Sequence, residues 1–472
     1  MKSQNKNFLL NVGYQILTYI FPLITVPYIS RVLGVDNTGV YAYTNSIVNM
    51  FMLITMLGIN NFGNRSIAKC RDDSKQLEKT FSSIYSLQLI MCVLLNAIYC
   101  IYMFGYAKQY KAILIIQGIQ LLSVAFDVNW FFWGLEKFKL TVIRNLIVKI
   151  ISIICIFIFV KNSSDLKVYT LIMVCATLFS QLYLFFNIPR YVKFCIPEVQ
   201  DILSNIKPCL ILFIPVLAYG IYRVMDKTMI GSLASVAELG NYENAERIIN
   251  IPIAVTTALG TVMLPRMSYL TGNASEKEVF SQIAESMKLA LMLAVAMSVG
   301  MFVYASEISL VMFGSEFEKS PGIIKALSIT VIISAWANVI RTQYLIPKEK
   351  DRIYVFSTII GAVLNFVCNI CLIRRMGAYG ACIGTVLAEG YVALYQTIMI
   401  KNELPIKEYL GYLLKCLINT SFIIAVSYVC TFMIQKVLIK LIFAIVIAGI
   451  MFLLVYGEYL IKEFLGKSKN YS

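Results

Sequence analysis

The chain contains no histidine among its 472 residues. Histidine is the side chain whose ordinary pKa lies closest to neutral pH, and it is the most common general base in enzymes. Any proton coupling in this protein therefore has to use carboxylates. The chain also has no Asp-x-Asp pair, the arrangement with which metal-using sugar transferases hold a divalent cation. A membrane glycosyltransferase or polysaccharide polymerase is thus disfavoured, and we expect a protein that is not an enzyme.

Charged side chains are scarce as well, at 14% of the residues, whereas 59% are apolar and the mean hydropathy is +0.75. Soluble domains are usually about 25% charged. Apolar stretches of about twenty residues, each long enough to cross a bilayer, recur from one end of the chain to the other. They predict an all-α integral membrane protein with about fourteen spanning helices, at residues 8–30, 38–62, 80–104, 110–134, 140–160, 167–190, 207–232, 244–268, 284–304, 320–345, 352–373, 378–400, 407–434 and 438–462.

The connections between these helices are at most about twenty residues long, which excludes a separate extramembrane domain. The net charge of +15 is spread over the short loops, so a nucleic-acid partner is not expected. Segments assigned to the inner side hold about twice as many Lys and Arg residues as the outer loops, which predicts that both termini are cytoplasmic. The first apolar run is too long for a cleavable signal. We expect no cofactor. We also expect no metal site, because structural zinc needs four ligands, and the CxxC pair of Cys368 and Cys371 lies in an apolar stretch without a second pair or any histidine.

Two sequence similarities between the halves of the chain indicate an internal repeat. Gly39-Val-Tyr41 follows a proline-bearing helix in the first half, and Gly240-Asn-Tyr242 follows another in the second. Trp133-Gly-Leu-Glu136-Lys137 and Leu345-Ile-Pro-Lys348-Glu349-Lys350 each close the fourth helix of their half. Six helices per repeat predict two parallel halves related by an axis near the membrane normal. The predicted lobes are residues 1–205 and 206–405, and residues 406–472 carry two additional helices and a tail.

Four segments carry a resemblance to a known family: Pro22–Tyr41, Gly58–Arg65, Met225–Arg247 and Gly377–Glu389. With the predicted helix count of six, six and two, they make the chain similar to the bacterial polysaccharide (oligosaccharide) flippases of the multidrug/oligosaccharidyl-lipid/polysaccharide exporter superfamily. The resemblance implies two six-helix lobes that face one another in a V and alternate access to a central cavity. It also implies a multi-pass protein of the bacterial plasma (inner) membrane.

The function that the resemblance implies is transport of an oligosaccharide linked to polyprenyl pyrophosphate, of the undecaprenyl type, from the inner to the outer leaflet. The product would serve lipopolysaccharide O-antigen or capsule assembly. Expected partners are this lipid-linked oligosaccharide, membrane lipid, a polysaccharide polymerase and a chain-length regulator. A cation-coupled exporter of drugs or metabolites and a lipid II flippase are alternatives within the superfamily. An acidic, aromatic cavity would favour the drug exporter, whereas a surplus of cations within the spans favours the anionic lipid.

An anionic cargo requires cations inside the spans, where each charge costs about 2.5–3.5 kcal/mol on insertion scales and so usually faces a cavity or a partner. The candidate substrate-binding residues are Arg223, Lys227, Arg247, Lys149 and Arg341. Arg223 and Lys227 share one helix face with Asp226, but such helix-end charges can instead pair with each other at the outer interface. Arg341 lies near an inner helix end, where snorkelling to water is the simpler interpretation. Arg144 lies closer to a helix end than Lys149, in a position typical of the membrane interface.

Three carboxylates are candidates for ion coupling: Asp127, Asp226 and Glu389. Asp127 and Glu389 fall within predicted spans, in apolar surroundings. A carboxylate there can take up a proton or a cation on one side of the membrane and release it on the other. Pairing with a neighbouring Arg or Lys is the alternative, and the sequence leaves open whether H⁺ or Na⁺ drives transport.

Overall fold

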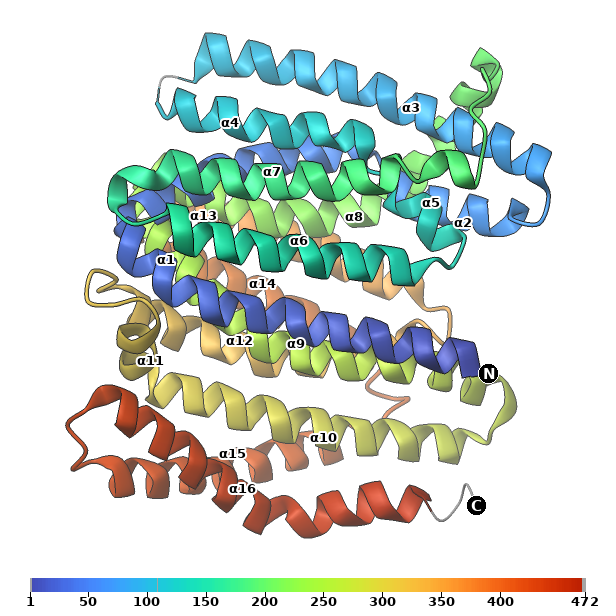
Figure 1. The fold of residues 1–472 in the computed structure, drawn as a ribbon. Helices are drawn as coiled ribbons and strands as arrows, with labels where there is room; N and C mark the ends of the chain where they lie inside the picture. Colours follow the sequence, from blue (N-terminus) through green and yellow to red (C-terminus); the bar gives the residue numbers. More distant parts are fainter. Residues whose placement is uncertain (1, 108, 469–472) are drawn as a thin grey trace. The chain divides into compact units, whose positions relative to one another are not determined.

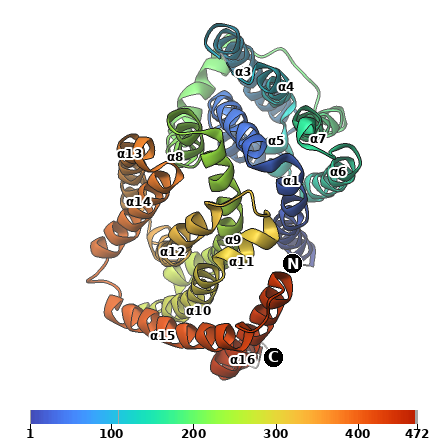
Figure 2. The same ribbon diagram turned by 90° about the vertical axis from the view of Figure 1, so that its left-hand side faces the viewer.

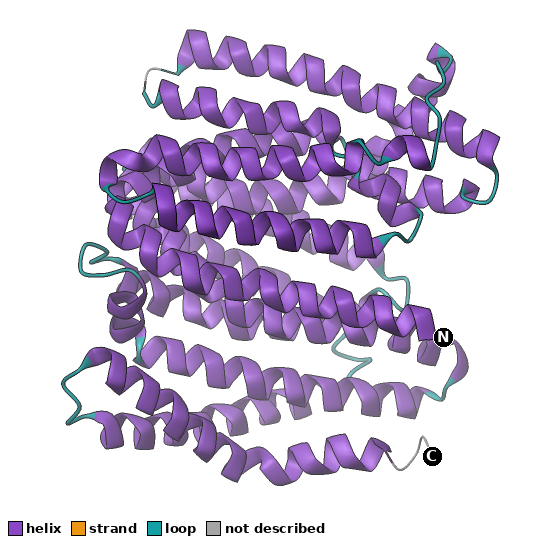
Figure 3. Cartoon of the chain, viewed as in Figure 1, coloured by secondary structure: helices purple, strands orange, loops and turns teal. Residues whose placement is uncertain are grey.

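The structure is a computed structural model that describes the backbone of residues 2–107 and 109–468. Side chains are described for residues 21–107, 109–213, 217, 220 and 224–459. All regular structure in the described chain is helical (Figure 3), which confirms the predicted all-α fold. The chain forms two compact units, Met1–Glu243 and Asn244–Ser472. The lobes predicted at 1–205 and 206–405, and their V-shaped arrangement, stay predictions.

The first unit contains eight helices that lie wholly within it. They are α1 (Lys2–Met56), α2 (Ile59–Cys70), α3 (Ser74–Ile101), α4 (Lys111–Leu122), α5 (Asn129–Gly134), α6 (Phe138–Phe159), α7 (Leu166–Phe185) and α8 (Val199–Leu233). Helix α7 packs between α4 and α6, and α1 contacts α3, α4, α6 and α8. Figure 1 shows α6 and α7 running side by side. Helix α9 (Val236–Asn273) begins in this unit and continues into the second.

The second unit continues with seven further helices. They are α10 (Glu276–Val303), α11 (Ala305–Met312), α12 (Ser320–Ile340), α13 (Asp351–Met376), α14 (Ala378–Met399), α15 (Ile406–Thr431) and α16 (Val437–Ser468). Helix α12 packs against both α10 and α14, and α14 pairs along its length with α13. Of the last two helices, α15 contacts α10, as the view along the helices in Figure 2 shows, and α16 contacts α15 and α11.

Eleven helical segments of the described chain are long and apolar enough to cross a membrane. The first of them, Phe21–Cys70, contains the end of the span predicted at 8–30 and all of the span predicted at 38–62, because the helical path between the two is interrupted only at Gly34. Gly34 takes φ 77°, a left-handed conformation that glycine adopts without strain, and the helix resumes directly after it. Helices α8 and α14 match the predicted spans 207–232 and 378–400 but are not among the eleven. The exact count of fourteen stays a prediction.

The span predicted as a continuous helix at 110–134 is broken between α4 and α5. A tight helical turn, Ser123–Phe126, follows α4, and Asp127 and Val128 then leave the helical path. Gln88 of α3 supplies the hydrogen bonds that a break requires, because its Nε2 donates to the carbonyls of Val124 (2.6 Å) and Asp127 (2.9 Å). The same side chain accepts a hydrogen bond from Trp130 Nε1 at 2.9 Å. Helix α5 is thereby anchored to α3.

The second of the two sequence similarities corresponds to the same backbone turn in both halves. Glu136 and Glu349, 213 residues apart, have φ values of 57° and 55°. The amide of Lys137 donates to the carbonyl of Phe132 at 2.9 Å, and that of Lys350 donates to the carbonyl of Leu345 at 2.8 Å. The next helices, α6 and α13, start at residues 138 and 351, with the same offset. The similarity is therefore one of local structure as well as sequence.

The two Gly-x-Tyr segments cross each other with their backbones in contact. A Cβ atom on Gly39 would lie 1.7 Å from the carbonyl oxygen of Val236, and one on Gly240 would lie 2.1 Å from that of Val35. Residues 35 and 236 are 201 positions apart, as are residues 39 and 240. Each segment thus presents its glycine to the equivalent carbonyl of the other, as two elements related by a twofold axis do.

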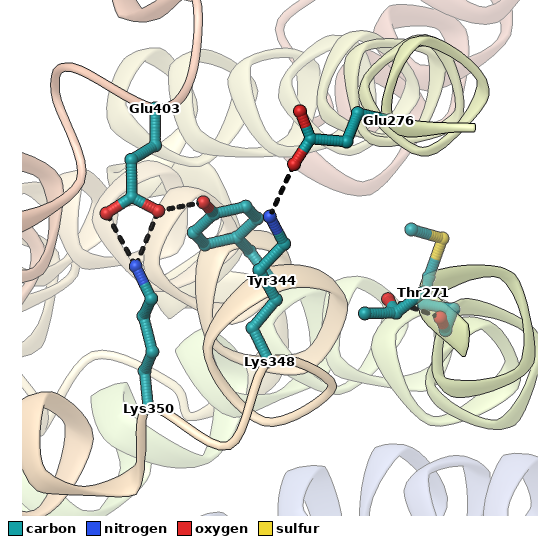
Figure 4. A network of polar contacts seen from close by, with 7 residues as sticks. Thr271, Glu276, Tyr344, Lys348, Lys350 and Glu403 are labelled. Carbon is teal, nitrogen blue, oxygen red and sulfur yellow. Dashed lines mark hydrogen bonds and ion pairs between the residues drawn. The ribbon is translucent and has the colours of Figure 1, made fainter. Parts of the chain in front are cut away.

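A polar network joins the turn after α12 to the connection between α14 and α15 (Figure 4). Lys350 Nζ donates to both carboxylate oxygens of Glu403, and the Tyr344 hydroxyl donates to the same carboxylate. Lys348 Nζ lies 3.5 Å from Glu276 Oε1 at the start of α10. The hydrogen bonds from Lys350 and Tyr344 hold the pKa of Glu403 below its ordinary value.

Candidate functional site

The break before α5 places Asp127 where its side chain can organise the residues that follow. Its Oδ1 accepts hydrogen bonds from the backbone N–H of Asn129 at 3.1 Å and from Asn129 Nδ2 at 2.6 Å. Asn129 Nδ2 also lies 3.2 Å from Gln181 Oε1 on α7. Asp127 therefore fixes which way the Asn129 amide faces, with its NH₂ group toward Asp127 and Gln181 and its oxygen toward α6.

Arg144 of α6 occupies the space that the Asn129 oxygen faces. Its Nη2 donates to Asn129 Oδ1 at 3.1 Å and to Asn145 Oδ1 at 2.7 Å, and its Nη1 donates to the carbonyl of Ser180 at 3.1 Å. Arg144 is only 5% exposed. Its guanidinium group is part of a buried network that ties α5, α6 and α7 together, and its predicted place at the membrane interface stays a prediction.

A cavity of about 430 Å³ opens beside this network, between α1, α5, α6 and α7. Its size is within the range typical of small-molecule sites, about 300–1,000 Å³. One face of α6 supplies Arg144, Asn145 and Lys149, and α7 supplies Gln181. Phe21 of α1 and Trp133 of α5 add aromatic walls. Among the described residues that line the cavity, two carry a positive charge and none carries a carboxylate.

Lys149, which the sequence analysis proposed as a substrate contact, lines this cavity from the middle of α6. Its Nζ lies 5.8 Å from the centre of the Phe21 ring, within the range of a cation–π contact. The arrangement combines a cation, amide and hydroxyl groups and flat apolar surfaces in one recess. Such a recess is suited to an oxygen-rich, negatively charged ligand that also has apolar faces.

The charged cluster predicted on α8 and α9 is brought together by the fold, in part. Lys227 Nζ lies 2.7 Å from Glu243 Oε2, and the Tyr242 hydroxyl donates to Asp226 Oδ2 at 3.2 Å. Asp226 and Glu243 are only 4% and 7% exposed. Pairing of these charges with each other was the alternative to substrate binding that the sequence left open. The pair is largely buried, however, rather than directed to water. Arg223 belongs to α8, but its side chain lies outside the described residues.

The remaining candidates belong to the second unit. Arg247 is half-buried on α9, one helical turn after Glu243, and Glu389 is half-buried on α14. Arg341 Nη2 donates to Asn338 Oδ1 at 2.9 Å, and its guanidinium lies 5.5 Å from the ring centre of Tyr354. None of the three lines the cavity of the first unit. Their roles in substrate binding or ion coupling stay predictions.

Most of the residues that build the cavity carry no clear signal in the sequence. Asn129 and Gln181 were not singled out, Trp133 was noted only as part of the internal repeat, and Arg144 was assigned to the interface. Asp127-Val-Asn129 offered one usable signal, because an Asp two residues before an Asn is typical of a helix start or turn rather than a helix interior. Gln181 offered another, as an isolated amide in the apolar run of α7.

Comparison with known proteins gives a consistent picture. Residues 5–271 match the sequence model of a protein family that is described as "Polysaccharide biosynthesis protein". The chain is 24% identical over 418 residues to a protein of Shigella dysenteriae named "Putative O-antigen transporter", which covers 84% of this chain and 100% of that protein. Among solved structures, this chain resembles the lipid II flippase MurJ in an inward closed conformation, with a TM-score of 0.69 and 15% sequence identity. The match covers 93% of this chain and 99% of that structure. This chain also resembles an inward-facing multidrug resistance transporter of the MATE family, with a TM-score of 0.62 and 15% sequence identity. That match covers 84% of this chain and 98% of the transporter structure.

Proposed function

Because the chain belongs to the polysaccharide biosynthesis protein family, we propose that it is a flippase for lipid-linked oligosaccharides. It moves the oligosaccharide from the inner to the outer leaflet of the bacterial plasma membrane by alternating access, for assembly of O-antigen or capsule. The names of its relatives support the transport of a glycan, and the MurJ-like and MATE-like fold supports a transporter rather than an enzyme. Both termini are cytoplasmic in this proposal.

The observation that carries the proposal is the cationic cavity inside a membrane-spanning unit. Arg144 and Lys149 both lie on α6, within a candidate span. Placing each charge there costs about 2.5–3.5 kcal/mol on insertion scales, so a purely structural helix would avoid it. A polar, anionic headgroup that has to cross the bilayer gives both cations a function. The isoprenoid tail of the same molecule can remain in lipid.

The cargo that fits this chemistry is a polyprenyl-pyrophosphate oligosaccharide of the undecaprenyl type. Its pyrophosphate requires further cations, for which Arg223, Lys227, Arg247 and Arg341 are the candidates. Asp127, Asp226 and Glu389 are the candidates for ion coupling. A polysaccharide polymerase and a chain-length regulator are the proposed protein partners, since the exported unit has to be polymerised at the outer face.

A cation-coupled exporter of drugs or metabolites is the second candidate, because the fold is shared with a multidrug transporter. A drug that carries a positive charge would be repelled by Arg144 and Lys149, and no carboxylate among the described lining residues would attract it. A lipid II flippase is closer in chemistry, because its cargo also contains pyrophosphate. A test that separates the two flippases must therefore compare lipid-linked cargoes that differ in their glycan.

The test is transport by the purified full-length chain in proteoliposomes. Undecaprenyl-pyrophosphate oligosaccharide is placed in one leaflet, and its arrival in the other is measured with a membrane-impermeant enzyme that cleaves exposed glycan. We expect transport by the native chain, its loss in Arg144→Ala, and normal transport in Lys415→Ala, a matched control whose lysine is exposed on α15. The proposal is wrong if the native chain moves no lipid-linked oligosaccharide but exports a cationic dye.

A further inference from the structure

We infer that a groove between α10 and α12 binds an anionic phospholipid of the membrane, with Lys325 as the contact for the lipid phosphate. The groove has a volume of about 340 Å³ and lies between the end of α10 and the beginning of α12. In the topology of the proposed function, this end of both helices faces the outer leaflet. The bound lipid is not the transported cargo, so the site does not depend on the proposed function.

Two small side chains bring α10 and α12 together at the floor of the groove. Ser298 and Ser328 are only 4% and 3% exposed, and Ser298 Oγ donates to the carbonyl of Ser328 at 2.7 Å. Ser328 Oγ donates in turn to the carbonyl of Lys325 at 2.8 Å. Both hydroxyl groups therefore donate within the protein, so neither has a proton left for a ligand. The polar contact for a ligand has to come from the Lys325 side chain.

The walls of the groove are apolar. Val299 and Phe302 line it from α10 and Ile329 lines it from α12, and the side chains of Phe302 and Ile329 are 53% and 48% exposed. Lys325 and Ile329 are four residues apart, so they lie on one face of α12, with Ile329 one turn deeper in the span. A ligand that fills the groove thus needs an apolar chain beside Ile329 and a negative charge at the level of Lys325.

Lys325 places a positive charge at the edge of this apolar groove. Its side chain is exposed, and no carboxylate in the described part of the chain pairs with its ammonium group. Lys325 lies five residues, or about 7–8 Å, after the beginning of α12. From this depth a lysine side chain reaches the level of the lipid headgroups. A charge within a span usually faces a cavity or a partner, and a lipid phosphate is the partner available at this level.

A second groove on α10 provides an internal comparison. It has a volume of about 290 Å³, lies between α10 and α15, and shares Val299 with the first groove. A lysine lies beside it too, because Lys440 Nζ is 5.2 Å from the ring centre of Tyr428, which lines this second groove. Lys440, however, is paired with Glu307 at 2.7 Å. The second groove is therefore suited to an acyl chain alone, whereas the first is suited to a chain and a phosphate.

The single cation also selects among lipids that carry phosphate. The headgroup of phosphatidylglycerol carries one negative charge, which one lysine can balance. A polyprenyl pyrophosphate carries several negative charges on a compact group and requires converging Arg or Lys side chains. Lys325 is the one basic residue among the described residues that line the groove. An anionic phospholipid therefore matches the groove more closely than the lipid carrier of the cargo does.

Quenching of tryptophan fluorescence by brominated lipid measures which lipid occupies each groove. Ile329→Trp places an indole in the first groove, and Tyr428→Trp places one in the second. Each full-length variant is reconstituted in phosphatidylcholine vesicles that contain increasing fractions of dibromo-phosphatidylglycerol. The fluorescence of the three native tryptophans is measured in the parent chain and subtracted. The dependence of quenching on lipid fraction gives the binding constant of phosphatidylglycerol relative to that of phosphatidylcholine at each position.

At Ile329→Trp we expect phosphatidylglycerol to be preferred by about fivefold, the effect of one lysine on binding of an anionic lipid. Adding Lys325→Gln should remove this preference, and adding Lys325→Arg should keep it. Tyr428→Trp should show no preference, since Glu307 neutralises Lys440. Equal binding of both lipids at Ile329→Trp, or a preference that survives Lys325→Gln, means non-selective annular lipid and overturns the inference. An equal preference at Tyr428→Trp overturns it too.

Unlabelled undecaprenyl pyrophosphate distinguishes a phospholipid site from a site for the lipid carrier of the cargo. We expect it to displace dibromo-phosphatidylglycerol from the first groove no better than unlabelled phosphatidylglycerol does. Stronger displacement would assign the groove to the carrier lipid and overturn the inference. None of these measurements involves transport, so their outcome leaves the flippase proposal to be tested separately.

Discussion

The crossing of Gly39 and Gly240 gives the sharpest prediction about stability. Each glycine faces a backbone carbonyl of the other segment, so the obstacle to a larger side chain cannot move by changing a rotamer. In Gly39→Ala the new Cβ atom would lie 1.7 Å from the carbonyl oxygen of Val236, whereas ordinary van der Waals contact starts at 3.4 Å. The two segments would have to separate by more than 1 Å to accommodate the methyl group.

The expected cost follows from comparison with an ordinary helical glycine. Replacing glycine by alanine inside a helix stabilises it by up to about 1 kcal/mol. Overpacking a tight contact costs about 1–3 kcal/mol, and here the neighbouring backbone leaves little room for relaxation. We therefore expect Gly39→Ala and Gly240→Ala to lower the free energy of unfolding by about 1–3 kcal/mol each. For a unit of this size, that loss corresponds to a decrease in Tm of roughly 2–12 °C.

Thermal unfolding of the purified protein in detergent, followed by tryptophan fluorescence, measures the effect. Gly390→Ala on α14 and Gly449→Ala on α16 are matched controls, because a Cβ atom at either position meets nothing within 4 Å. Both should be neutral or slightly stabilising. The double variant should lose less than the sum of the single losses, since both changes separate the same two segments. A Tm of Gly39→Ala or Gly240→Ala equal to that of the controls, or fully additive losses, would refute the reasoning.

Three further predictions address other parts of the chain. The pKa of Glu403 is lowered by Lys350, so the stability that this carboxylate contributes should be present above its ordinary pKa of 4.5 and lost as the pH falls below it. Glu403→Gln should flatten that acid-side slope of Tm against pH. Gln88→Leu leaves the Asp127 carbonyl and the Trp130 indole N–H without this partner and removes one of the two donors to the Val124 carbonyl, so it should lower the free energy of unfolding by about 2–4 kcal/mol in chemical denaturation. In a cysteine-free background, Ser74→Cys should be shielded from impermeant thiol reagents in intact cells and Asn162→Cys labelled; the reverse would overturn the cytoplasmic placement of both termini.

Most of the helices could be predicted because a bilayer imposes a simple requirement on sequence. A span needs about twenty apolar residues with its charges at the ends, so hydropathy alone locates it. The structure begins α6 at 138, α13 at 351 and α15 at 406, each within two residues of the predicted start. The turn at Glu136 and Glu349 was also visible, because similar sequence in the two halves encodes the same local backbone.

The features that escaped prediction depend on contacts between residues far apart in the chain. The break between α4 and α5 is stabilised by Gln88, more than thirty residues earlier, and the local signal Asp127-Val-Asn129 does not reveal that contact. Arg144 is buried because Asn129 and Ser180 reach it from two other helices. Hydropathy shows how deep a residue lies along a helix, but not which neighbour its helix face meets. The positions of spans were therefore predictable, whereas the members of the cavity were not.

The turn shared by the two halves aligns α6 with α13, so each position of α6 has an equivalent position in α13. Helices α6 and α13 start 213 residues apart, so Arg144 corresponds to Ser357 and Lys149 to Ala362. Ser357 is fully buried and accepts a hydrogen bond from Gln396 Nε2 at 2.9 Å. The two halves thus share the backbone turn and the helix that follows it but differ in their side chains. The cationic residues of α6 have no counterparts at these positions of α13. Ser357→Ala should cost about 1–2 kcal/mol of stability, because the hydroxyl group also donates to the carbonyl of Tyr354 at 2.8 Å and both hydrogen bonds are lost. It should leave transport of lipid-linked oligosaccharide unchanged in the proteoliposome assay, in contrast to Arg144→Ala. Loss of transport in a stably folded Ser357→Ala variant would mean that both halves take part in recognition.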